Sequence, residues 1–240
     1  TTTIPAALDS LQIVYRREQQ LWHWQQGTAR PLRGVAEVNN FSLSPDGAWL
    51  VVERNDELWL MRSDGTGERL VVDHAALEPL APDEPRGRVQ LEQWLPDSQQ
   101  FLFRVASAET NFALGSRLYL FDVADAQWRE LMMLNWGTGV LPAPDGAAIA
   151  LISQAELRLM DLDGGNLRTA FTYTPGAFMH LQRPHVRWGA DSQSLVTVDP
   201  DAGLSVWEIA RDGTESILLA EVDPQLSSPY NHRLGRYALL

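Results

Sequence analysis

A turn built from proline, aspartate and glycine recurs along this chain, and each copy comes directly before a short apolar run. The clearest copy is Ser44-Pro45-Asp46-Gly47, which precedes residues 48–52, and a second is Pro144-Asp145-Gly146, which precedes residues 148–152. The turn aspartates of five copies are 37, 51, 48 and 46 residues apart by subtraction of their numbers: Asp9, Asp46, Asp97, Asp145 and Asp191. A period of about 40–50 residues is typical of β-propeller blades.

Each part of this turn has a physical role. Proline presets φ, aspartate bonds its own backbone, and glycine adopts positive φ without steric cost. Apolar runs of about five residues between such turns indicate strands. Long helices are excluded because proline and glycine recur too often, and the most helix-tolerant stretch, residues 73–80, meets Pro79 and Pro82.

Two further apolar runs follow in each copy. The third runs lie at residues 21–24, 58–61, 118–121, 157–160 and 204–207, and the fourth runs at 29–32, 68–72, 128–132, 167–171 and 215–219. One four-stranded sheet cannot bury both of its faces alone, so it needs copies of itself. The sequence therefore predicts an all-β fold, a β-propeller of four-stranded antiparallel blades with five full repeats and the start of a sixth.

The predicted organisation is a single β-propeller domain over residues 1–240. Its blades are expected at about 3–34, 38–73, 89–133, 138–173 and 185–220, with a partial blade at 229–240. The partial blade lacks its third and fourth strands, and an open sheet edge has to be paired or covered. We therefore expect the chain to be part of a longer propeller of about six to eight blades, or to be completed by another segment or chain.

Composition excludes several classes of partner and chemistry. The formal net charge is −12, with 19 basic residues, all arginine, against 31 acidic ones, so a nucleic acid is not an expected partner. The chain has no cysteine, which excludes disulfides, thiolate catalysis and cysteine-ligated zinc. No apolar run approaches the length of about 18 residues that a membrane span needs.

The Ser-Pro-Asp-Gly turn followed by an apolar strand resembles the WD40-like β-propeller repeat of the TolB family. This repeat also recurs in the propeller domains of prolyl-oligopeptidase-like peptidases. The best matches are Ser44-Pro45-Asp46-Gly47 with residues 58–65, and Pro144-Asp145-Gly146 with residues 157–164. The resemblance implies a propeller with the first strand of each blade innermost. It also implies a location outside the cytoplasm, periplasmic or at the cell surface, although a cysteine-free chain suits either side of a membrane. It implies no single ligand or reaction.

Motifs for catalysis are not evident. No Gly-x-Ser-x-Gly occurs, so a peptidase catalytic domain is not expected within this chain. Residues 161–166 carry closely spaced oxygen ligands but lack the later glutamate of a calcium loop, and a hairpin turn is expected there. The carboxylate pairs Asp83/Glu84 and Asp199/Asp201 lie in proline-containing loops and are expected to be solvated. No metal and no cofactor is predicted.

Candidate binding residues gather in the predicted loops. In a propeller, the connectors between blades lie on the same face as the loops between second and third strands, around the mouth of the central channel. Long loops with polar and aromatic residues on a rigid scaffold are where binding is usually placed. The candidates are His74, Glu109, Asn111, Phe112, Asn135, Trp136, His180, Arg183, His185, Tyr230 and His232.

The nine tryptophans divide between core and surface. Those within strands are expected in the core: Trp49, Trp59, Trp94, Trp188 and Trp207. Trp136, in Asn135-Trp136-Gly137, is the candidate for a surface anchor.

The function expected from these features is a non-enzymatic scaffold that binds a protein partner, a ligand or a further domain of the same chain. The alternative is a propeller enzyme, or the accessory propeller of a hydrolase, peptidase or lyase. In that alternative Arg183 would clamp an anionic substrate, while His180 and His185 would move a proton or hold a metal. A third reading is a purely structural module of a larger chain.

Overall fold

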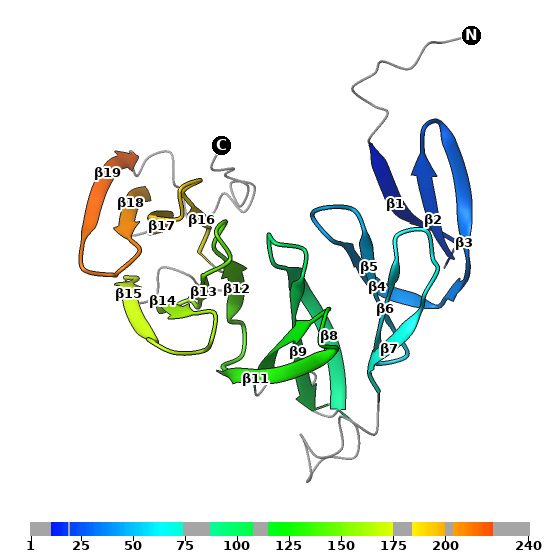
Figure 1. The fold of residues 1–240 in the computed structure, drawn as a ribbon. Coiled ribbons are helices and arrows are strands. Elements are labelled where there is room, and N and C mark those ends of the chain that lie inside the picture. The colour runs from blue at the N-terminus through cyan, green and yellow to red at the C-terminus, as the bar shows by residue number, and fades with distance from the viewer. Residues whose placement is uncertain are drawn as a thin grey trace. The chain divides into compact units, whose positions relative to one another are not determined.

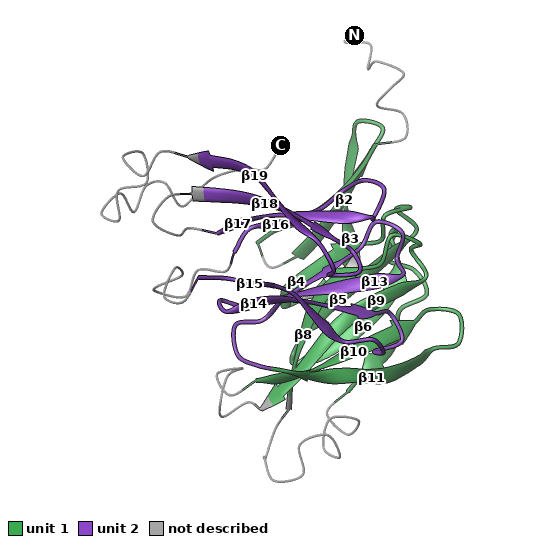
Figure 2. Ribbon diagram, turned by 90° about the vertical axis from the view of Figure 1, so that its left-hand side faces the viewer, with its two compact units in different colours: residues 1–134 green, residues 135–240 purple. Residues whose placement is uncertain are grey.

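The computed structural model shows an all-β protein (Figure 1). It describes residues 11–18, 20–73, 87–107, 115–174, 184–199 and 204–222, and every regular element in these ranges is a strand. The chain divides into two compact units, Thr1–Leu134 and Asn135–Leu240, coloured separately in Figure 2. The predicted single domain and its blade limits stay predictions.

Unit 1 contains three antiparallel sheets in which neighbouring strands are consecutive in sequence. The first sheet consists of β1 (Gln12–Arg17), β2 (Gln20–Gln25) and β3 (Thr28–Ala36). The second consists of β4 (Val38–Leu43), β5 (Trp49–Arg54), β6 (Glu57–Arg62) and β7 (Arg69–Val72). The third consists of β8 (Gly87–Trp94), β9 (Gln100–Ser107), β10 (Ser116–Asp122) and β11 (Gln127–Leu134).

Unit 2 contains two more sheets with the same meander order. The fourth sheet consists of β12 (Gly139–Pro142), β13 (Ala148–Ile152), β14 (Glu156–Asp161) and β15 (Arg168–Thr172). The fifth consists of β16 (Val186–Trp188), β17 (Ser194–Asp199), β18 (Leu204–Ala210) and β19 (Ser216–Val222). The predicted third and fourth runs of all five copies coincide with strands, so the predicted meanders are confirmed. The expected first strand of the first copy and the start of the sixth copy lie outside the described residues.

The turn between β4 and β5 shows why the Ser-Pro-Asp-Gly sequence recurs. The Asp46 carboxylate oxygen Oδ1 accepts hydrogen bonds from the Ser44 hydroxyl (2.6 Å) and the Ala48 amide (2.9 Å). Gly47 has φ +73°, which a side chain would strain. Burial raises the pKa of Asp46, but the hydrogen bonds from Ser44, Ala48 and Ser98 outweigh it, and the net pKa is lowered.

The serine copies of the turn link neighbouring sheets. Ser98 and Ser192 stand where Gly47 and Gly146 stand in the other copies, and both have φ +61°. The Asp46 amide donates to the Ser98 hydroxyl (2.9 Å), and the Asp145 amide donates to the Ser192 hydroxyl (2.9 Å). The two serines therefore make specific contacts between the turns of successive blades. From the sequence alone, both turns look only like weakened copies of the glycine turn.

Two further hydrogen bonds repeat at the same two junctions. The indole of Trp94 donates to the Ser42 carbonyl (3.1 Å), and the indole of Trp188 donates to the Leu141 carbonyl (3.1 Å). In the last strands, Arg69 donates to the Val123 carbonyl (2.6 Å) and Arg168 to the Asp212 carbonyl (3.0 Å). The second and third sheets thus form one hydrogen-bonded blade pair, and the fourth and fifth sheets form another.

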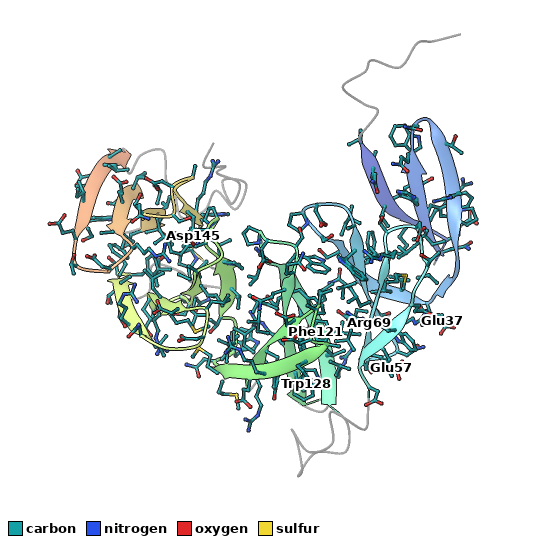
Figure 3. All side chains as sticks on the ribbon, viewed as in Figure 1. Glu37, Glu57, Arg69, Phe121, Trp128 and Asp145 are labelled. Carbon is teal, nitrogen blue, oxygen red and sulfur yellow. The ribbon has the colours of Figure 1, made fainter. Side chains whose placement is uncertain are left out.

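Apolar side chains fill the space between successive sheets within each unit. In the first blade pair one buried cluster joins Val51, Leu58 and Leu60 of the second sheet with Phe101, Phe103 and Tyr119 of the third. Phe121 and Trp128 can be followed on the third sheet in Figure 3. In the second pair a buried cluster joins Ala143, Ala148, Ala150, Leu157, Leu159, Tyr173, Trp188, Leu195 and Ile209.

Of the five strand tryptophans that were predicted in the core, two are buried and three are half-buried. Trp94 and Trp188 are buried in the two blade pairs. Trp49, Trp59 and Trp207 are half-buried. The Arg62 guanidinium lies 3.8 Å from the ring centroid of Trp49, the Arg54 guanidinium lies 4.3 Å from that of Trp59, and Phe171 packs against Trp207.

Candidate functional site

Three predicted binding residues lie within the described chain, and all three belong to unit 2. They are Asn135, Trp136 and His185. The other eight lie outside the described residues: His74, Glu109, Asn111, Phe112, His180, Arg183, Tyr230 and His232. Their gathering around a channel mouth stays a prediction.

Trp136 sits on a tight turn that leads into the first strand of the fourth sheet. The Thr138 amide donates to the Asn135 carbonyl (3.2 Å), and Gly137 has φ +74°. The indole of Trp136 is 51% exposed, and Asn135 beside it is also exposed. A large aromatic group is therefore held half in water on a backbone that its turn geometry fixes, which is how an anchor for a partner is presented.

His185 occupies the corresponding place before the fifth sheet. It is exposed and immediately precedes β16, as the Trp136 turn precedes β12. Its backbone carbonyl accepts a hydrogen bond from the Thr197 hydroxyl (3.0 Å), which fixes the end of the connector against β17. The two predicted residues thus lie at the entry of the first strands of neighbouring sheets.

A buried polar cluster, which sequence reasoning missed, lies at the same end of the fifth sheet. The Tyr173 and Thr197 hydroxyls are 2.8 Å apart, and Thr174 donates to the Oδ2 atom of Asp199 from both its amide (3.1 Å) and its hydroxyl (3.0 Å). Burial raises the pKa of the Tyr173 phenol, the Thr197 hydrogen bond lowers it, and the Asp199 charge raises it further.

The expectation of a solvated Asp199 is wrong. Asp199 is the last residue of β17 and only 5% exposed. The strand continues past Val198, so Asp199 pairs with Ser205 of β18 and Thr174 covers it. Asp201, Asp83 and Glu84 lie outside the described residues.

Unit 1 contains a cluster of charged side chains, Glu53, Asp56 and Arg88, that the sequence did not indicate. The Glu53 carboxylate accepts the Leu91 amide hydrogen bond across the first blade pair (3.1 Å). Burial raises the pKa of Glu53, the Leu91 bond lowers it, and the Asp56 charge raises it. Arg88 pairs with Asp56 at 3.3 Å. Perturbed carboxyl groups are often functional, but a bond between two sheets is a sufficient structural role for this one.

Charged side chains also meet inside the third sheet. The Arg104 Nε atom lies 2.6 Å from a Glu92 carboxylate oxygen, and both side chains are largely buried. Glu92 falls at a register shift between Leu91 and Gln93, and such bulges change the direction of a side chain. The alternation of polar and apolar residues along a strand could not by itself predict this ion pair.

The oxygen-rich segment at residues 161–166 forms the predicted hairpin turn. The Asp161 amide donates to the Gly165 carbonyl (2.9 Å), and the Gly165 amide donates to the Asp163 carboxylate (2.7 Å). In the part of the chain that the structure describes, no three histidine, aspartate or glutamate side chains gather as a metal site. Nor do those ranges contain a helix of the length and apolarity that crossing a membrane requires.

Comparisons with known proteins identify the fold. No family model matches the chain. The dipeptidyl peptidase 4 structure of Porphyromonas gingivalis is similar with a TM-score of 0.65 at 10% identity, over 87% of this chain and 37% of that one. An oligogalacturonate lyase in complex with manganese has a TM-score of 0.60 at 14% identity, over 80% of this chain and 54% of that one. A protein described as TolB from Agrobacterium tumefaciens has a TM-score of 0.50 at 17% identity, over 88% and 76%.

One curated protein also matches in sequence. It is described as dipeptidyl-aminopeptidase B from Talaromyces marneffei and is 35% identical over an alignment of 78 residues, which covers 29% of this chain and 9% of that protein. The chain therefore spans a small part of this relative and about half of the lyase structure.

Identities this low between structures define the fold alone. The chain has the β-propeller fold of TolB-type proteins, and the fold is shared with the dipeptidyl peptidase 4 and oligogalacturonate lyase structures. The resemblance in the repeated turns is thus confirmed at the level of architecture.

Proposed function

We propose that this chain is a propeller scaffold that binds a protein partner or ligand through the connectors that enter the first strand of each blade. The observation that carries the proposal is Trp136, whose half-exposed indole stands on a turn fixed by Gly137. His185 enters the next sheet of unit 2 in the same way and supplies a polar neighbour on a second connector.

A rigid aromatic group at this position offers binding free energy at low entropic cost. An anchor that is already ordered loses little conformational freedom when a partner covers it. Truncation of a tryptophan hot spot costs about 2 kcal/mol or more, which corresponds to about a 30-fold increase in Kd. Trp136→Ala should therefore weaken binding by at least that factor and leave folding unchanged.

The test uses a photo-crosslinking amino acid at position 136 of the chain to identify the partner, followed by affinity measurements with the purified partner. Ile217→Ala is the matched control, because Ile217 is a similarly exposed apolar side chain of the same unit, 55% against 51%. The proposal expects a large loss for Trp136→Ala and less than about a twofold change for the control. Equal affinities of wild type and Trp136→Ala would overturn it.

An extracytoplasmic location belongs to the same proposal. The likeness to a TolB structure supports it. Fractionation of the source cells with antibodies against the chain tests this, and recovery in the cytoplasmic fraction would refute it.

An accessory propeller of a peptidase is the second candidate. It is supported by the 35% identity with a dipeptidyl-aminopeptidase over 78 residues and by the fold likeness to dipeptidyl peptidase 4. On this candidate the partner of the connectors is a catalytic domain. Crosslinking from position 136 to a hydrolase domain would favour it, whereas release of nitroaniline from dipeptidyl nitroanilides by the chain alone would contradict both candidates.

A metal-dependent lyase is the remaining enzyme candidate. It rests on the likeness to a lyase structure in complex with manganese and on the exposed His185. Metal analysis of the purified chain tests it, because stoichiometric manganese that is lost in His185→Ala is expected only on this candidate.

A further inference from the structure

One cross-strand pair repeats in the last two strands of the first four sheets. The inner member of the pair lies opposite the residue five positions after the turn aspartate and is buried in each sheet, and the outer member is an arginine. The pairs are His23 with Arg30, Leu60 with Arg69, Leu120 with Arg129 and Leu159 with Arg168. At the same place the fifth sheet pairs Glu208 with Ile217, so the polarity of the pair is reversed.

In the second and fourth sheets this pair belongs to the junction with the following blade. Leu60 and Leu159 are fully buried in the clusters that join the two sheets of each blade pair. Arg69 donates to the Val123 carbonyl of the next blade (2.6 Å), and the fourth sheet makes a similar bond to the fifth. The leucine thus supplies apolar contact, and the arginine holds a turn of the covering blade.

Glu208 and Ile217 lie on the face of the fifth sheet that is turned away from the fourth. Trp207 and Ile209 flank Glu208 in β18 and contact the fourth sheet, and successive side chains of a strand point to opposite faces. The Glu208 Oε1 atom accepts a hydrogen bond from the Ser194 hydroxyl (2.8 Å), and Glu208 is half-buried, whereas Ile217 is 55% exposed. An apolar blade packed here would bury the carboxylate without a compensating charge, which is costly. The face therefore suits an occupant that combines a cation with apolar side chains.

The chain itself carries such a segment directly after β19. Residues 224–240 contain Arg233 and Arg236, two tyrosines and four leucines, but no aspartate or glutamate, in a chain of net charge −12. The eleven residues from Val222 to Arg233 can span about 36 Å, whereas Ile217 lies five strand residues, or about 17 Å, before Val222. The segment is therefore long enough to turn back along the outer strands.

We propose that residues 224–240 dock on the outer strands of the fifth sheet, with Arg233 or Arg236 paired with Glu208 and apolar side chains over Ile217. The guanidinium donates to the carboxylate in a charge-assisted hydrogen bond and compensates its charge. The junction then has an arginine as the others do, but the arginine belongs to the covering segment instead of the covered sheet. The predicted partial blade at 229–240 is part of this segment.

Amide hydrogen exchange of the full chain tests the docking. We expect residues 224–240 of wild type to exchange at least about tenfold more slowly than a synthetic peptide of the same sequence, and Glu208→Arg to remove this protection. Glu208→Gln keeps an acceptor for the Ser194 hydroxyl, which protects the test against a folding defect, and it should lose at least about threefold of the protection. Glu215→Arg is the matched control: it reverses an exposed carboxylate in the turn before β19 and should keep wild-type protection.

Charge exchange identifies the arginine. Glu208→Arg combined with Arg233→Glu, or with Arg236→Glu, should recover the protection in one of the two double variants. The inference is overturned if the wild-type segment exchanges as the free peptide does, if both Glu208 variants keep wild-type protection, or if neither double variant recovers it. Protection that appears only at high protein concentration would overturn it too, because a second copy of the chain would then be the occupant.

Discussion

The serine turns predict how the blade pairs are held together. Ser98 is buried, and its hydroxyl accepts the Asp46 amide hydrogen bond from the preceding blade. Ser98→Ala removes the acceptor and leaves the Asp46 amide without its partner, which costs about 1–3 kcal/mol. Because alanine also keeps the left-handed backbone at φ +61°, it gains nothing in return.

Ser98→Gly separates the hydrogen bond from the backbone strain. Glycine loses the same acceptor but adopts positive φ freely, which recovers about 1 kcal/mol. We therefore expect both variants to be destabilised, with Ser98→Gly closer to wild type. For a chain of this length each kcal/mol corresponds to a shift of about 2–4 °C in Tm.

Amide hydrogen exchange measures the contact itself. The Asp46 amide should exchange faster in both Ser98 variants, while the Asp145 amide, bonded to Ser192 in the other pair, should not change. Ser192→Ala is the reciprocal control, and it should affect Asp145 alone. Unchanged exchange at Asp46, or a Ser98→Gly variant less stable than Ser98→Ala, would show that the Ser98 hydroxyl does not hold the two blades together.

Two pH effects follow from buried titratable groups. Burial raises the pKa of Glu53 above its ordinary 4.5, so the free energy of unfolding should fall as the pH rises from 4.5 through the raised value. Glu53→Gln keeps an acceptor for the Leu91 amide, and chemical denaturation of this variant should no longer show the fall. Burial lowers the pKa of His23 below 6.5, and the charge of Arg30 lowers it further. The charge of Asp64 acts in the opposite direction but does not outweigh them. Unfolding free energy should then decrease as the pH falls from 6.5 to the lowered value, and a His23→Gln variant with the same decrease would contradict this.

Local chemistry explains what the sequence predicts well. The turns contain their own hydrogen bonds, as Asp46 shows with Ala48, so the strands that flank them can be located without knowledge of the fold. The predicted run at residues 118–121 lies within β10 for this reason. The apolar runs between the turns also predict that Trp94, which lies within a strand, belongs to the core.

Contacts between residues that lie far apart in the chain could not be predicted from the sequence. The Ser98 hydroxyl meets an amide from the preceding blade, so a serine in place of glycine looks like a weakened turn until the two sheets are side by side. Asp199 looks like a loop residue because nothing local indicates that Thr174 covers it. Of the predicted binding residues, Trp136 and His185 owe their place to the connectors, which the repeat does locate.

The proposed partner binds at the connector end of the blades, with Trp136 as its anchor. Amide hydrogen exchange of the chain with and without the crosslinked partner tests this most directly. Binding through these connectors should protect residues 135–138 and the start of β16, and leave β19 unchanged. Protection confined to the outer strand β19, with residues 135–138 exchanging as in the free chain, would contradict it.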